Sequence, residues 1–309
     1  MKYVWIMKLN DAFFQKRKLQ TLVENQTTYS LTNAEMHVFE THQQAEQVLL
    51  RFDQPVLASM LTGKKVMHLE DRPSFDFLPG ESLILPANEL MCIDFPEARI
   101  DNPTRCLAMT ISEEKIDRVV QLMNETMQKA DAKEWLFSED AFKFTDDAVL
   151  HQIIHRLLFY FTENHPSRDL FVEFTLKELI IRMLQTETKI HYQNNAKLLA
   201  TSNAMASIVD YIQNNLDKSI TVTELSRKAY MSESNFHRVF KNELGLSPIE
   251  FINEERLKKA SALLRYSRKK VKEICIECGY NSLSYFTRLF KRKYRVSPAK
   301  YQKNMGGRV

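Results

Sequence analysis

Glycine is scarce in this chain, whose 309 residues contain only six. All of them fall at expected turns or in the C-terminal tail: Gly63, Gly80, Gly245, Gly279, Gly306 and Gly307. Phosphate-binding loops of the GxxxxGK[ST] or GxGxxG type need closely spaced glycines, because the backbone must approach the phosphates. The sequence has no such cluster and no GxSxG nucleophile turn. These absences argue against nucleotide-dependent enzymes and hydrolases, and we expect no catalytic residue and no cofactor.

Long apolar runs are also missing. No stretch approaches the ~20 apolar residues that span a bilayer, and the apolar run within residues 1–8 is too short for a secretion signal. The four cysteines show no spacing typical of a disulfide framework, which suits a reducing compartment. We therefore expect a cytoplasmic protein, with enough chain for two or three domains.

Two local patterns could indicate metal binding. Cys275 and Cys278 have CxxC spacing, but a second ligand pair is missing, and one pair is half of a tetrahedral zinc site. His151 and His155 lie four residues apart on an expected helix, without a third ligand or an intervening glutamate. Scaffold positions are favoured for the two cysteines and ordinary helix-face positions for the two histidines, and no metal site is expected.

The charge of the chain is divided unequally. Residues 201–309 carry 21 Lys and Arg against 10 Asp and Glu, a net +11, which leaves −7 for the first 200 residues. A basic segment beside an acidic remainder is typical of a module that binds nucleic acid. A solvated basic face would give the same charge, so the charge alone does not decide.

A repeated sequence in the same segment indicates that the basic segment binds DNA. Residues 222–251 and 271–301 share one pattern at an offset of 49 to 50 residues, including Phe-x-x-x-Phe-Lys and a later Ser-Pro. Such a period indicates two copies of one supersecondary unit. In the first copy, Thr221 and Glu224 form a capping-box pattern, and Gly245 is expected to end a recognition helix over 233–244. A helix from Pro248 to about residue 265 would join the two copies.

Each expected recognition helix has two faces. The pairs Phe236/Phe240 and Phe286/Phe290 have i, i+4 spacing and are expected to face the core. The opposite faces carry side chains that can bind base edges or phosphates. These candidate DNA-binding residues are Ser234, Asn235, His237, Arg238 and Lys241 in the first copy, and Ser284, Tyr285, Thr287, Arg288, Lys291 and Arg292 in the second.

The first half of the chain has a different periodicity. About eight short apolar stretches separated by turn residues over 30–111 predict a jelly-roll or small barrel, either hollow or solid. Helical periodicity begins at Ser112 and predicts three helices before residue 190. These helices could pack on the barrel or on a second subunit, and we expect both, which would give a homodimer. A polar run over 190–204 is expected to link the parts.

The repeat closely resembles the AraC/XylS family of bacterial transcription regulators. The resemblance depends on Arg256-Leu257, Ala260, Gly279-Tyr280, the 284–291 stretch and Ser297-Pro298, and it covers roughly 205–303. It implies seven helices with two helix-turn-helix motifs, an asymmetric DNA site, and activation through contacts with RNA polymerase. Arg295 stands where the family usually has glycine, which predicts a strained left-handed cap or a different helix end.

A weaker resemblance covers residues 61–86, which are similar to the cupin-like regulatory domain of many family members. Cupin enzymes bind metal through a His-x-His cluster, whereas this segment has only the scattered His37, His42 and His68. The resemblance therefore implies a barrel that receives a small-molecule signal, with no ligand-binding residue identified.

The chain is thus expected to have an α+β fold. The expected divisions are a β-rich cupin-like regulatory domain (1–111), a helical linker or dimerisation region (112–190), an interdomain linker (191–204) and an all-α tandem helix-turn-helix domain (205–303). The expected function is a sequence-specific, ligand-responsive transcription activator that is not an enzyme. Two alternatives stay open at this point: a cupin-like enzyme with a DNA-binding tail, and a non-specific architectural DNA-binding protein.

Overall fold

A computed structural model describes residues 19–31, 34–70, 72–137, 142–145, 148–267 and 269–306. These residues form two compact units. The N-terminal unit contains residues up to 123 together with 136–183, and the C-terminal unit contains residues 124–135 and 184 onward. Each unit is described by itself.

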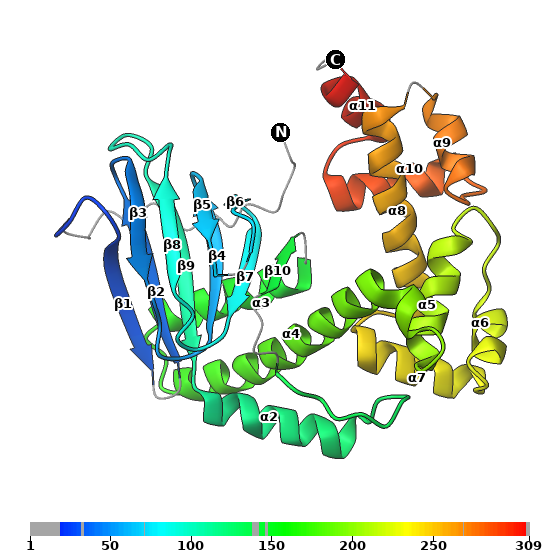
Figure 1. Cartoon of the computed structure of the whole chain (residues 1–309), viewed down its shortest axis with the longest axis horizontal. Coiled ribbons are helices and arrows are strands. Elements are labelled where there is room, and N and C mark those ends of the chain that lie inside the picture. The colour runs from blue at the N-terminus through cyan, green and yellow to red at the C-terminus, as the bar shows by residue number, and fades with distance from the viewer. Residues whose placement is uncertain are drawn as a thin grey trace. The chain divides into compact units, whose positions relative to one another are not determined.

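The N-terminal unit contains two antiparallel sheets (Figure 1). The first has the order β1-β2-β9-β4-β7-β10 and the second β3-β8-β5-β6. Their bounds are β1 Asn25–Leu31, β2 Ala34–Thr41, β3 Ala45–Leu50, β4 Val56–Thr62, β5 Lys65–His68, β6 Phe75–Phe77, β7 Glu81–Leu85, β8 Met91–Phe95, β9 Thr104–Ile111 and β10 Phe142–Thr145. The expected β-rich fold is confirmed, with β10 as an addition within the region that was expected to be helical.

The side chains between the two sheets form one core. Phe39 of β2 lies opposite Cys106 of β9 in the strand register. Both pack with Phe77, Phe95 and other buried apolar residues of both sheets. Because side chains alternate between the faces of a strand, Met36 and Val38 belong to the other face of β2, and they are also fully buried.

Three helices continue the chain: α2 (Glu113–Thr126), α3 (Ala148–Thr162) and α4 (Arg168–Leu199). Most of the predicted apolar faces are buried, as at Ile153 and Leu179. Val149 and Phe174, which the helical periodicity also places on these faces, are exceptions, at 38% and 59% exposure. Among the described residues, no helix combines the length and apolarity needed to cross a membrane, including the 32-residue α4.

Most of the segment expected as an interdomain linker, residues 191–204, is helical. Helix α4 continues through residues 191–199, and Asn203 then caps the next helix by accepting a hydrogen bond from the Ala206 N–H. The polar run predicted an interdomain linker, but Tyr192 and Ala196 are buried within it, at 5% and 4% exposure. These buried residues keep the segment helical, because its apolar side packs in the core of the C-terminal unit.

The remaining helices belong to the C-terminal unit. They are α5 (Ala204–Asn214), α6 (Val222–Lys228), α7 (Glu233–Leu244), α8 (Pro248–Tyr266), α9 (Val271–Glu277), α10 (Leu283–Tyr294) and α11 (Pro298–Gly306). Helix α8 joins the group α5–α7 to the group α9–α11 (Figure 1). The predicted extents of α7 and α8 agree with the structure to within about one residue.

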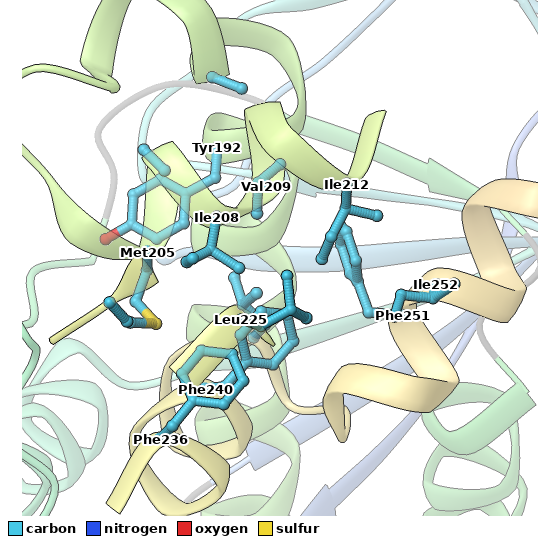
Figure 2. Close-up of a cluster of buried hydrophobic side chains, with 14 of the residues drawn as sticks. Tyr192, Met205, Ile208, Val209, Ile212, Leu225, Phe236, Phe240, Phe251 and Ile252 are labelled. Atoms are coloured by element: carbon cyan, nitrogen blue, oxygen red, sulfur yellow. The ribbon is translucent and has the colours of Figure 1, made fainter. Parts of the chain in front are cut away.

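Helix α8 contributes to two separate cores. Its first turns supply Phe251 and Ile252 to the core around α5, α6 and α7, and Figure 2 shows these side chains near Ile212. Its later turns supply Leu257, Ala260 and Leu264 to the core around α9, α10 and α11. The 19 residues of α8 extend over roughly 28 Å at 1.5 Å per residue. This helix therefore spaces two independently packed helical groups.

Candidate nucleic-acid interface

Helices α7 and α10 are built alike. Each begins after a serine N-cap, where Ser232 accepts from the Asn235 N–H and Ser282 accepts from the Tyr285 N–H. Their aromatic pairs are fully buried, with ring centroids 5.5 Å apart for Phe236/Phe240 and 5.7 Å for Phe286/Phe290. Burial of this face fixes which side of each helix remains in solvent.

The candidate residues lie on that solvent side in both helices. Nine of the eleven are exposed, and only His237 and Thr287 are half-buried: the exposed ones are Ser234, Asn235, Arg238, Lys241, Ser284, Tyr285, Arg288, Lys291 and Arg292. The structure thus presents each set together on one helix face. Both faces offer hydrogen-bond donors and positive charge, the chemistry that base edges and phosphates require.

The two helices hold their arginines differently. Arg238 donates from Nη2 to Asn235 Oδ1 at 2.8 Å, one turn earlier on α7. The guanidinium carbon of Arg288 lies 5.4 Å from the centroid of the Tyr285 ring. The hydroxyl of Tyr285 in turn accepts a hydrogen bond from Asn253 Nδ2 of α8, at 3.3 Å. Each arginine is therefore partly oriented before any ligand binds.

Arg256 connects the two helical groups. It donates from Nε to the carbonyl of Leu216 at 2.9 Å and from Nη2 to the carbonyl of Lys218 at 2.6 Å. Its guanidinium carbon also lies 5.6 Å from the ring centroid of Tyr280, in the turn of the second motif. One α8 side chain thus ties the end of the α5 segment to the second motif.

The turn of the first motif contains a residue that the sequence reasoning missed. Tyr230 is 97% exposed and has a φ of +53°, a left-handed conformation that is costly for a non-glycine residue. Its counterpart in the second motif is Gly279, with a φ of +74°. The alignment of the two repeats could have revealed this difference. The first turn therefore adds an exposed aromatic side chain beside α7.

The expected capping features are largely present. Thr221 accepts from the Glu224 N–H, but the Glu224 carboxylate accepts from the Tyr211 hydroxyl. Gly245 ends α7 at a φ of +72°. Arg295 ends α10 in the same left-handed conformation, with a φ of +62° and the matching hydrogen bond to the Lys291 carbonyl.

Three of the four residues that could have indicated metal binding are buried. Cys275 and Cys278 are buried, at 2% and 0% exposure, in the core of the second motif. Burial raises the pKa of Cys278 to about 11, so its thiol stays protonated at neutral pH. His151 is buried on α3 whereas His155 is exposed. Within the described part of the chain, no three His, Cys, Asp or Glu side chains are grouped to hold a metal ion.

Comparison with known proteins agrees with this architecture. Residues 33–190 match the family described as AraC-type transcriptional regulator N-terminus, and residues 225–304 match a helix-turn-helix domain. The chain belongs to the AraC-type transcriptional regulators. This confirms the resemblance of the repeat to the AraC/XylS family.

Several relatives are similar over part of their length. The chain is 34% identical over 164 residues to the probable transcriptional regulator LumQ of Photobacterium leiognathi, covering 52% of this chain and 62% of that protein. It is 38% identical over 92 residues to the transcriptional regulator MtrA of Neisseria gonorrhoeae, covering 30% of this chain and 29% of that one. The chain thus spans less than two thirds of these relatives.

A solved structure is also similar, the DNA-binding domain of AdpA in complex with a target DNA. It is 30% identical, with a TM-score of 0.34, and the match covers 35% of this chain and 96% of that domain.

Proposed function

We propose that this protein is a sequence-specific DNA-binding transcription regulator that reads an asymmetric site with α7 and α10 and responds to a small molecule. The supporting observation is the duplicated helix whose buried aromatic pair turns a polar, basic face to solvent. The eleven candidate residues are assigned to DNA on this basis. Relatives named as transcription regulators support the same assignment.

The two helices differ in the side chains they expose, so their preferred bases should differ. Tyr285 and Arg292 of α10 stand where α7 has Asn235 and Asn242. Because successive major grooves on one face of B-DNA are ~34 Å apart, two helices spaced by α8 are expected to bind half-sites about one turn apart. The expected site is therefore two unlike elements in a fixed order.

Selection from random duplexes by the full-length protein at fixed salt tests this proposal. The expected result is one recovered motif with two unlike half-sites separated by about 10 base pairs. Recovered pools without a shared sequence would instead favour the architectural alternative, which predicts similar affinity for all duplexes.

A cavity in the N-terminal unit supports the response to a small molecule. It has a volume of about 830 Å³, within the usual size range of small-ligand sites. Its lining includes Gln26, His37, Arg51, Phe52 and Asn88. His37 Nδ1 lies 2.9 Å from Gln26 Nε2, and burial lowers the pKa of His37, so its ring is neutral at physiological pH. Polar groups around a partly aromatic wall suit a small polar effector.

A metabolite screen with the selected duplex tests this part separately. An effector should shift the melting temperature of the protein and change its DNA affinity, and Arg51→Ala should weaken both effects. If no metabolite changes the DNA affinity, the response to a small molecule is refuted while DNA recognition is unaffected.

Two partners complete the proposal. Family membership supports contact with RNA polymerase and hence activation, and the helices of residues 112–190 support a homodimer. Reconstituted transcription from the selected site and sedimentation of the full-length protein would measure these two properties.

A further inference from the structure

Residues 124–135, which are the last residues of α2 and the segment that follows it, form a closed loop. The two ends are joined by reciprocal hydrogen bonds: Trp135 N donates to Asn124 Oδ1 at 2.6 Å, and Asn124 Nδ2 donates to the Trp135 carbonyl at 3.2 Å. Trp135 is 1% exposed, and its Nε1 donates to the Met127 carbonyl at 2.6 Å. A compact loop with adjoining ends is an Ω-loop. We call these residues the 124–135 loop.

This loop is bonded to the end of the first recognition helix. Glu243 in the last turn of α7 is fully buried, and its Oε1 accepts the Ala130 N–H at 2.5 Å. Its Oε2 accepts the hydroxyl of Tyr192, from α4, at 2.9 Å. Asn203 completes the network, donating from Nδ2 to the Tyr192 hydroxyl at 2.9 Å and to Asp131 Oδ2 at 2.8 Å. The network therefore has both of its ends on the 124–135 loop, at Ala130 and at Asp131.

A second contact holds the same helix end. Gln185 of α4 donates from Nε2 to the carbonyl of Asn242 at 2.9 Å. Carbonyls in the last turn of a helix have no partner within the helix, so this bond satisfies one of them. Together, the 124–135 loop, Gln185 and Tyr192 hold the end of α7 through side chains from outside the helix-turn-helix motif.

The second motif has a different polar contact at its matching position. Lys293 of α10 corresponds to Glu243 and is paired with Glu254 of α8, at 3.6 Å. Lys189 of α4 pairs with the same carboxylate, also at 3.6 Å. A buried carboxyl group is costly unless it is hydrogen-bonded, and an apolar residue would hold a helix end at less cost. Burial raises the pKa of Glu243, with Asp131 acting in the same direction and Lys129, Tyr192 and the Ala130 N–H opposing it. A buried carboxyl group bonded to the 124–135 loop occurs at this position in the first motif, where the second has a lysine, and this difference indicates a role beyond packing.

The base-reading face of α7 is left free by these contacts. Asn235, Arg238 and Lys241 are exposed, whereas the network touches the buried Glu243 and the main chain of Asn242. The contacts therefore orient the helix and do not cover it. In the sequence, the residues before and after the 124–135 loop belong to the N-terminal unit, so the loop is covalently connected to that unit at both ends.

We infer that Glu243, Tyr192 and Asn203 are positioning residues that set the DNA affinity of α7 according to whether the 124–135 loop is docked. This inference rests on the proposed function. Docking of the loop favours binding of the half-site read by α7 and leaves the half-site read by α10 unaffected. The first motif is thus the one through which the N-terminal unit acts on DNA.

Tyr192→Phe in the full-length protein tests the inference, because it removes one hydroxyl and keeps the ring that packs near Met205 and Ile208 (Figure 2). Affinity is measured for the selected duplex and for two versions with one half-site scrambled. The half-site read by α7 is the one at which Arg238→Ala relaxes base preference. Scrambling that half-site lowers the affinity of the wild-type protein by a certain factor. We expect this factor to be smaller by about fivefold or more in Tyr192→Phe. The factor for the other half-site should not change.

Hydrogen exchange of the Ala130 amide reports docking directly, and it should become faster in Tyr192→Phe. Glu243→Gln retains a carbonyl acceptor for that amide but faces the Tyr192 hydroxyl with a donor in place of its acceptor, so exchange and the α7 half-site effect should change in the same direction as in Tyr192→Phe. Tyr211→Phe is the matched control, because it removes a hydroxyl bonded to Glu224 in the same core, away from the loop. It should leave both half-site effects at their wild-type values.

Two outcomes would overturn the inference. One is faster exchange at Ala130 with unchanged half-site effects, since the network would then be structural only. The other is unchanged exchange at Ala130, since the hydroxyl would then not hold the loop. Failure of the wild-type protein to select any sequence would instead refute the proposed function, and the exchange data would still report whether the loop docks.

Discussion

At the scale of single residues, the ends of the two recognition helices provide a paired comparison. Gly245 and Arg295 have nearly the same φ, +72° and +62°, but only glycine adopts this region without steric cost. Arg295→Gly should therefore raise the free energy of unfolding by about 0.5–1 kcal/mol, because relief of strain exceeds the added freedom of the unfolded chain. Chemical denaturation would measure the change.

Gly245→Ala is the opposite control. It should destabilise the protein, since the left-handed conformation is strained and the new Cβ would lie 3.0 Å from Gln185 Oε1. Equal stability of Arg295→Gly and the wild type would show that contacts of the arginine side chain offset the strain.

The two arginines of the candidate interface give a second prediction at this scale. Arg238→Ala and Arg288→Ala should each weaken binding to the selected duplex by about 1–3 kcal/mol and relax base preference within one half-site only. The two affected half-sites should differ, because the arginines belong to different helices. Fluorescence anisotropy with a panel of single-base variants would measure both effects, and a uniform loss over the panel would reassign the arginine to a phosphate.

At the scale of helices, the two cores along α8 predict separable stabilities. Phe240 is fully buried, with its ring centroid 5.6 Å from that of Phe251. Phe240→Ala should therefore destabilise the group α5–α7 by about 3–5 kcal/mol. Amides of this group should exchange faster, while those of α10 and α11 should keep most of their protection.

Phe290→Ala, in the core of the second motif, should give the reverse pattern of exchange. If Phe240→Ala left the thermal transition of the protein unchanged, the assignment of the buried face of α7 would be wrong.

These helices also show what the sequence could predict. Local signals were sufficient for α7 and α8, because Ser232, Gly245 and the Ser247-Pro248 pair specify helix ends through their own hydrogen bonds and φ angles. The aromatic spacing likewise predicted the buried and exposed faces, and hence the exposed position of nine of the eleven candidate residues. The repeat made the prediction more secure, since both copies carry the same pattern.

The contacts of Glu243 could not be predicted in the same way. A glutamate in the last turn of an amphipathic helix is expected to be solvated, yet its partner Ala130 is 113 residues away in the sequence. The polar run at 190–204 was misleading for a similar reason, because Tyr192 and Asn203 make their contacts within the C-terminal unit. Long-range packing of polar groups leaves no periodic signal in a single sequence.

At the scale of the whole molecule, the charge distribution predicts how DNA affinity depends on salt. Residues 201–309 carry a net charge of +11 and the rest of the chain a net −7, so DNA binding should depend on the basic segment. Each phosphate contact releases counterions, and the logarithm of affinity falls with the logarithm of salt concentration in proportion to the number of contacts. Lys291→Ala should weaken binding to selected and random duplexes alike and reduce this slope by about 1.

Ser234→Ala is a useful comparison, because it changes the exposed face of α7 without changing the charge. It should leave the slope at its wild-type value, whatever its effect on base preference. Titrations of both variants at several salt concentrations would separate phosphate contacts from base contacts. If Lys291→Ala kept the full slope and lost affinity for the selected duplex alone, Lys291 would be a base-reading residue, and the basic end of α10 would contribute to specificity as well as to attraction.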